Sequence, residues 1–145
     1  MAQRTSVDLS EFPDLVVVYL GMRVRRLRGV MTVLGLGPGL SRSVAGRPDG
    51  LLLHEGMFYG LTHLGMRQYW RDMESLEAFT RSEPHKGWWR DYLRDTGGTG
   101  FWHETYRMRG GMEAIYIDMP PVGFARFAAG RRPEGAFMSA RGRLA

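Results

Sequence analysis

Histidines and one strand-like segment carry the side chains best suited to chemistry in this sequence. His85 directly follows Pro84 and lies three residues before Trp88, at the expected start of a helix. A helix N-terminus disfavours imidazolium, and a neutral imidazole can act as a general base or ligate a metal or haem. A histidine that only caps the helix or packs against the nearby tryptophans is the alternative for His85 taken alone.

The segment Phe101–Tyr106 mixes aromatic and ionisable side chains. On a strand, its even-numbered residues share one face and its odd-numbered residues share the other. A carboxylate and a phenol among aromatic rings can serve in proton transfer. We therefore predict that His103, Glu104 and Tyr106 join His85 as catalytic residues. A central strand with Glu104 paired to an arginine is the alternative.

Large apolar side chains near these groups could bind the body of a hydrophobic or aromatic substrate. The candidates for substrate contact are Trp70, Trp88, Trp89, Trp102 and Met119. His54 and Glu55 are adjacent on an expected strand, so they point to opposite faces and cannot both reach one ion. No spacing matches a zinc motif, and we expect no metal site of this kind.

The composition excludes several other classes. The chain has no cysteine, which rules out disulfides, thiolate metal ligands and a cysteine nucleophile. Residues 1–12 contain no apolar run typical of a secretory signal, and Leu15–Leu20 is too short to span a bilayer. We therefore expect a cytoplasmic protein. The net charge is +5, but the arginines are spread along the chain beside acidic residues, so nucleic-acid binding is disfavoured.

The hydrophobic pattern predicts a definite order of helices and strands. A β-branched run indicates a strand at Asp14–Gly21, and helical spacing follows over Met22–Val44, with a kink or break expected near Gly37–Gly39. A hairpin around Gly60, two helices and two strands come next. Their expected ranges are Leu51–Tyr59, Leu61–Arg71, Asp72–Ser82, Pro84–Asp95, Phe101–Met108 and Met112–Asp118.

This order predicts an α+β fold of the ferredoxin-like type, βαββαβ, with an antiparallel sheet. Helices would cover one face of the sheet, and a second copy of the chain would cover the other in a dimeric α+β barrel. At 145 residues one domain is expected. We place a flexible N-terminal arm at 1–12, the ferredoxin-like dimeric barrel domain at 13–125, and an arginine- and glycine-rich C-terminal tail at 126–145.

Three stretches resemble a family of inferred monooxygenases of unknown function within the dimeric α+β barrel superfamily. They are VVVYLGMRV at 16–24, QYWRDMESLEAFTRSEPH at 68–85, and GFWHETY at 100–106 followed by EAIYIDMPPVG at 113–123. The resemblance implies a homodimer with a pocket between the sheet and helices of each protomer. In haem-binding relatives a histidine on the helix after the third strand ligates iron, and His85 falls in a similar place. The chain departs from the family at 31–50 and 58–64.

Three functions remain open from the sequence. The first is a small oxidoreductase of the monooxygenase type, with or without haem, that acts on a hydrophobic or aromatic metabolite. The second is a non-redox enzyme of secondary metabolism on the same scaffold, such as a dehydratase, isomerase or cyclase, because a fold does not fix a reaction. The third is a ligand-binding protein without catalysis.

Overall fold

The structure is a computed structural model that describes residues 2–118 and 120–144. The chain forms two compact units. One is continuous and spans residues 16–106, whereas the other joins the flanking segments 1–15 and 107–145. No helix among the described residues is both long enough and apolar enough to cross a membrane.

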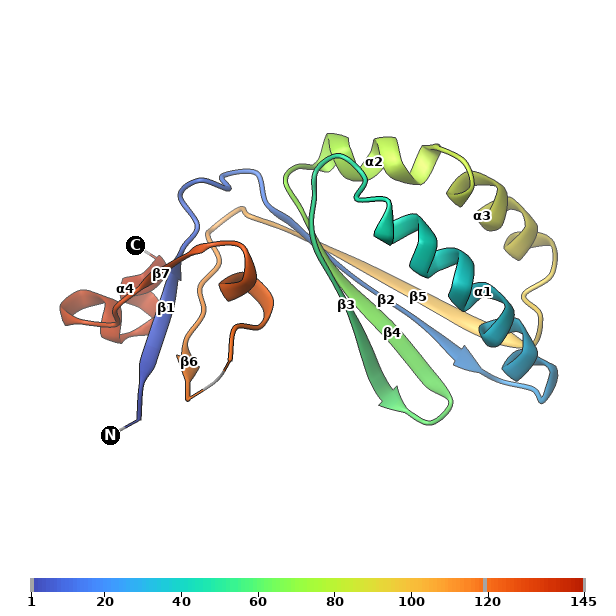
Figure 1. Ribbon diagram of the computed structural model, residues 1–145, viewed down its shortest axis with the longest axis horizontal. Coiled ribbons are helices and arrows are strands. Elements are labelled where there is room, and N and C mark those ends of the chain that lie inside the picture. The colour runs from blue at the N-terminus through green and yellow to red at the C-terminus, as the bar shows by residue number, and fades with distance from the viewer. Residues whose placement is uncertain (1, 119, 145) are drawn as a thin grey trace. The chain divides into compact units, whose positions relative to one another are not determined.

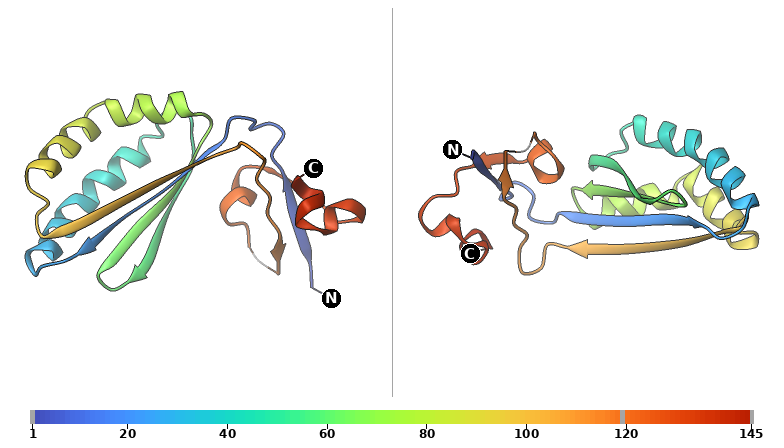
Figure 2. Two further views of the ribbon diagram at one scale, coloured as in Figure 1. Left: turned by 180° about the vertical axis from the view of Figure 1, so that it is seen from behind. Right: turned by 90° about the horizontal axis from the view of Figure 1, so that it is seen from below.

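The central unit contains a four-stranded sheet in the order β3-β4-β2-β5. Strand β4 pairs antiparallel with β2 and with β3, and α1, α2 and α3 cover one face of the sheet (Figures 1 and 2). This arrangement confirms the predicted ferredoxin-like α+β fold. The elements are β2 Val16–Val24, α1 Arg28–Ala45, β3 Leu51–Gly60, β4 His63–Trp70, α2 Met73–Arg81, α3 His85–Arg94 and β5 Thr99–Arg107.

The core lies between the sheet and α2. Val16 and Val18 from β2 pack with Trp70 from β4 and Leu76 from α2. Strand β2 is an interior strand, which explains why its sequence is a continuous apolar run rather than an alternating one. Fully burying one valine side chain contributes about 1.5–3 kcal/mol, so these few residues anchor α2 firmly to the sheet.

Helix α1 is continuous over 18 residues, so of the predicted kink or break near Gly37–Gly39 the break is wrong. Pro38 cannot donate a backbone hydrogen bond, yet it lies inside the helix. A Cβ atom at Gly39 would lie only 3.0 Å from Cζ2 of Trp88, so the glycine lets the Trp88 ring pack closely against α1. Packing of this kind can override a weak helix propensity.

The flanking unit contains a second sheet in the order β6-β1-β7. Its strands are β1 Arg4–Asp8, β6 Tyr116–Ile117 and β7 Ala129–Arg131. Two 3-10 helices, η1 Gly123–Arg126 and η2 Gly135–Met138, and helix α4 Ala140–Leu144 complete it. Ser6 and Val7 of β1 are buried.

The predicted strand Met112–Asp118 is thus much shorter, as β6, and belongs to this second sheet rather than to the barrel sheet. Strand β1 lies within the segment expected to be an arm, and β7 within the segment expected to be a tail. Strands of two to five residues give too little alternation to be recognised in a sequence. The domain boundaries at 13 and 125 remain a prediction.

Candidate functional site

His85 is the first residue of α3 and lies among aromatic side chains. Its ring centroid is 5.4 Å from that of Phe79 and 6.5 Å from that of Trp88. Burial lowers the pKa of His85, an interaction with the Thr80 backbone opposes this shift, and the charge of His103 adds to it. The Nδ1 atom is buried and has no hydrogen-bond partner among the described residues. His85 is therefore a neutral imidazole with one unsatisfied nitrogen.

The odd-numbered residues of β5 face the helices. The Phe101 ring lies 5.5 Å from that of Trp89 and 6.0 Å from that of Tyr92, both on α3. His103 shares this face by strand alternation, which is consistent with its electrostatic effect on His85. The structure thus brings together His85, His103, Trp88 and Trp89 on what we call the helix face, the side of the four-stranded sheet covered by α1, α2 and α3.

The even-numbered residues of β5 lie on the opposite side, which we call the bare face. Trp102 Nε1 donates a hydrogen bond to His63 Nε2 at 2.7 Å. The hydroxyl of Tyr106 donates to Glu104 Oε2, and this bond raises the pKa of Tyr106. The sheet therefore separates Trp102, Glu104 and Tyr106 from His85, and the predicted catalytic residues form two groups, in keeping with the alternation expected along the strand.

An ion pair that the sequence reasoning missed lies at the centre of the bare face. Arg67 donates to Glu55 Oε1 from Nε at 3.0 Å and from Nη2 at 2.8 Å, and it reaches the Tyr19 hydroxyl from Nη1 at 3.2 Å. Its guanidinium also lies 5.3 Å from the ring centroid of Tyr69. The feature that brings this pair together is the hairpin register, in which Glu55 lies opposite Arg67.

Trp70 is a core residue rather than a substrate contact. Its side chain is fully buried against Phe79, with the ring centroids 5.2 Å apart. A side chain without exposed surface cannot touch a ligand, so this part of the prediction needs correction. The error arises because a sequence does not reveal which of several tryptophans the fold encloses. Met119 lies outside the described residues.

Trp70 begins a hydrogen-bonded chain along the helix face. Its Nε1 donates to Gln68 Oε1 at 3.1 Å, and Gln68 Nε2 lies 3.1 Å from His54 Nδ1. Burial lowers the pKa of His54. The sequence reasoning considered His54 only as a metal ligand, and no group of three metal-binding side chains occurs among the described residues. This contact depends on the register that pairs His54 with Gln68, which the expected hairpin around Gly60 did not give.

Much of the helix face is only half-buried. Leu20 and Met66 point toward the helices by their register with core residues, and both keep partial exposure. Gly56 follows His54 by two residues on the same side of β3, and a Cβ atom there would meet no heavy atom within 4 Å. Beyond the core around Trp70, the helix face is therefore open to solvent beside His54.

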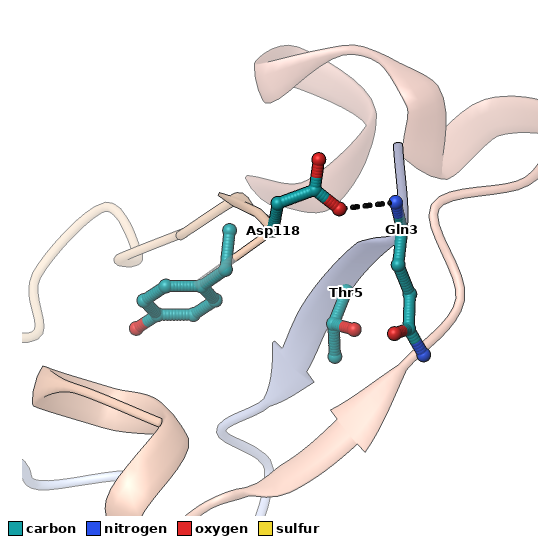
Figure 3. Close-up of a pocket in the computed structure, with 4 residues that line it drawn as sticks. Gln3, Thr5 and Asp118 are labelled. Carbon is teal, nitrogen blue, oxygen red and sulfur yellow. Dashed lines mark hydrogen bonds between the residues drawn. The ribbon is translucent and has the colours of Figure 1, made fainter. Parts of the chain in front are cut away.

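A separate pocket of about 430 Å³ lies in the flanking unit, lined by Gln3, Thr5, Tyr116 and Asp118. Figure 3 shows the backbone N–H of Gln3 directed at Asp118 Oδ1, a distance of 2.8 Å. Its lining includes none of the predicted catalytic residues. Polar groups that already satisfy one another give it no evident chemistry.

Solved structures share the fold. Two crystal structures of aldoxime dehydratases, one of them in complex with butyraldoxime, match with a TM-score of 0.66 at 21% and 20% identity. They cover 88% and 90% of this chain, but the chain spans only 38% of their length. A protein of unknown function from Nitrosomonas europaea matches with a TM-score of 0.52 at 9% identity, covering 77% of this chain and 99% of its own. Such low identities establish the fold alone.

Fold and comparisons together define an α+β protein of the ferredoxin-like class. A family model described as Monooxygenase af470-like matches residues 15–124. Because this match covers most of the chain, the protein belongs to that family, and the resemblance read from the sequence is confirmed. No curated protein sequence matches the chain significantly.

Proposed function

We propose that this protein is an oxidoreductase of the monooxygenase type that transforms a small hydrophobic or aromatic metabolite on the helix face, around His85. The observation that carries the proposal is the His85 ring itself. It is neutral because burial lowers its pKa, it lies near the rings of Phe79 and Trp88, and its buried Nδ1 lacks a partner among the residues that the structure describes. Buried polar atoms without partners are rare and are often functional.

The same ring fits haem as a cofactor. Metals bind the neutral form of imidazole, and the half-buried aromatic surroundings of His85 suit a flat apolar group. Haem held by His85 would supply the one-electron and oxygen chemistry that side chains lack. His103, on the same face, would hold or move a proton, and Trp88 and Trp89 would contact the apolar body of the substrate.

The test is the visible spectrum of the purified protein, before and after haemin is added. We expect a Soret band that His85→Ala removes and that His103→Ala leaves in place. If His85→Ala keeps the band, His85 is not the ligand. Oxygen uptake on turnover, followed with an oxygen electrode, then tests the redox assignment.

A second candidate is a non-redox dehydratase. The similarity in fold to aldoxime dehydratases over 88% of the chain favours it, although the chain spans a minor part of those proteins. Butyraldoxime is the natural probe, because its dehydration consumes no oxygen. Loss of butyraldoxime without oxygen uptake, followed by gas chromatography, would favour the dehydratase over the monooxygenase.

We also propose that the protein is a homodimer in which the bare faces of two copies meet. Tyr59 and Tyr106 on this face are 46% and 48% exposed, and the side chains of Arg67 and Glu55 keep 24% and 18% of their surface exposed. A second sheet would remove these aromatic rings from water, a change that favours association.

A further inference from the structure

We propose that His54 donates a hydrogen bond from Nε2 to an oxygen atom of the bound substrate, and that Trp70 and Gln68 hold it in the tautomer that allows this. The proposal rests on the proposed function in one respect, the placing of substrate on the helix face. It otherwise depends on which atoms donate and which accept in the hydrogen bonds that link Trp70, Gln68 and His54, and on the open surface beside His54.

The direction of the chain is fixed at its buried end. An indole N–H can only donate, so the Gln68 atom that meets Trp70 Nε1 at 3.1 Å is the carbonyl oxygen. The Gln68 amide nitrogen must then point to His54 Nδ1, 3.1 Å away. Because an amide nitrogen donates, Nδ1 accepts, and the ring proton resides on Nε2.

The Trp70 and Gln68 end of this hydrogen-bonded series is shielded from water. Trp70 is fully buried and Gln68 is 5% exposed. Glu55, the neighbour of His54, projects from the bare face, where it binds Arg67. Burial lowers the pKa of His54 and outweighs the opposing effect of Glu55, so the neutral ring persists near neutral pH.

The donor atom of His54, Nε2, has no partner within the described parts of the chain and lies on an open part of the helix face, although the ring is half-buried. Gly56, on the same face of the edge strand β3, is exposed and places no side chain beside His54, and its half-buried cross-strand neighbour Met66 adds apolar surface there. A neutral N–H donor beside apolar surface suits a carbonyl or hydroxyl oxygen on a hydrophobic molecule, such as an aromatic ketone.

The tautomer is tested first, by long-range ¹H–¹⁵N NMR of the histidine rings in the free protein. We expect His54 to carry its proton on Nε2 in a single form. Trp70→Phe keeps most of the bulk but frees the Gln68 amide to rotate, so a mixture of both tautomers should appear. Trp89→Phe is the matched control and should leave His54 unchanged. A proton on Nδ1 in the wild-type protein overturns the proposal.

The donor role is tested with acetophenone and with ethylbenzene, which has no oxygen. Acetophenone should shift the His54 Nε2 signal saturably and bind about 3- to 10-fold more tightly than ethylbenzene, the net effect of one hydrogen bond. His54→Phe should abolish this preference, and Gly56→Leu should weaken binding of both compounds without altering the tautomer.

A His54 signal that acetophenone leaves in place overturns the donor role, whatever the tautomer. Neither readout requires haem, oxygen or turnover. A protein that binds no haem and consumes no oxygen can therefore still pass both tests, and failure of the proposed function is distinguishable from failure of this inference.

Discussion

At the scale of single residues, His85 should lower the free energy of unfolding. An unsatisfied buried polar group is unfavourable by about 1–3 kcal/mol, and Nδ1 of His85 is such a group. We expect His85→Phe to raise the free energy of unfolding by about 1 kcal/mol in urea denaturation, while it abolishes the Soret band or turnover. His103 is exposed, so His103→Phe should change the stability by less than half as much. Equal effects of the two substitutions would contradict this interpretation.

Two histidines should make the stability depend on pH. The pKa values of His54 and His85 lie below the ordinary value of 6.5, so below that pH the unfolded chain binds protons that the folded chain does not. Stability then rises with pH. Their contribution is complete above about pH 6.5 and is lost as the pH falls toward the folded pKa values.

The measurement is urea denaturation at pH 5.5 and at pH 7.5. We expect the wild-type protein to be less stable at pH 5.5, and His54→Gln combined with His85→Phe to show a smaller difference between the two values. A double variant with an unchanged difference would assign the pH dependence to other groups.

Single residues also show how far the sequence could predict the site. Pro84 marks a helix start, so the place of His85 at the first residue of α3 was accessible from local signals alone. The hydrogen bonds that link Trp70, Gln68 and His54 were not accessible in this way. They depend on the register between β3 and β4, and the sequence did not fix that register to the exact residue. A shift of one residue would have put Gln68 on the bare face.

At the scale of elements, Gly21 lets β2 and β5 fit together. A Cβ atom at Gly21 would lie 2.5 Å from Trp102 Nε1, so Gly21→Ala must displace the indole and break its bond to His63. We expect a loss of about 1–3 kcal/mol and a shift in tryptophan fluorescence. At Gly60 a Cβ atom meets nothing within 4 Å, so Gly60→Ala should cause neither effect.

In helix α1, by contrast, replacement of a glycine should stabilise the protein. Gly37 lies inside the helix, and a Cβ atom there would meet no heavy atom within 4 Å. Gly37→Ala should therefore stabilise the protein by about 0.5–1 kcal/mol, measured as a rise in the thermal midpoint by circular dichroism. A fall would indicate that the glycine serves a contact made only in the assembled or ligand-bound protein.

The predictions for elements succeeded where signals were local. Helix α2 is an example, since the expected range Asp72–Ser82 agrees with the observed Met73–Arg81, and Asp72 accepts from the Ser75 N–H at 2.7 Å at its start. Local signals failed for α1, where glycine and proline indicated a kink or break but packing of Trp88 on Gly39 supports a continuous helix. They also could not show that β1 pairs with β7, more than 100 residues away in the chain.

At the scale of the whole molecule, the bare face should make the protein a dimer. A stable interface buries roughly 800 Å² on each partner, and a four-stranded sheet with exposed tyrosines can supply such an area. Tyr59→Arg with Tyr106→Arg would place two charges on each of two facing sheets, and like charges without partners oppose burial. We expect native mass spectrometry to show a wild-type dimer and a monomer for this variant. Leu93→Arg, at a more exposed apolar site on α3, should remain dimeric. A wild-type monomer at micromolar concentration would contradict the bare-face interface.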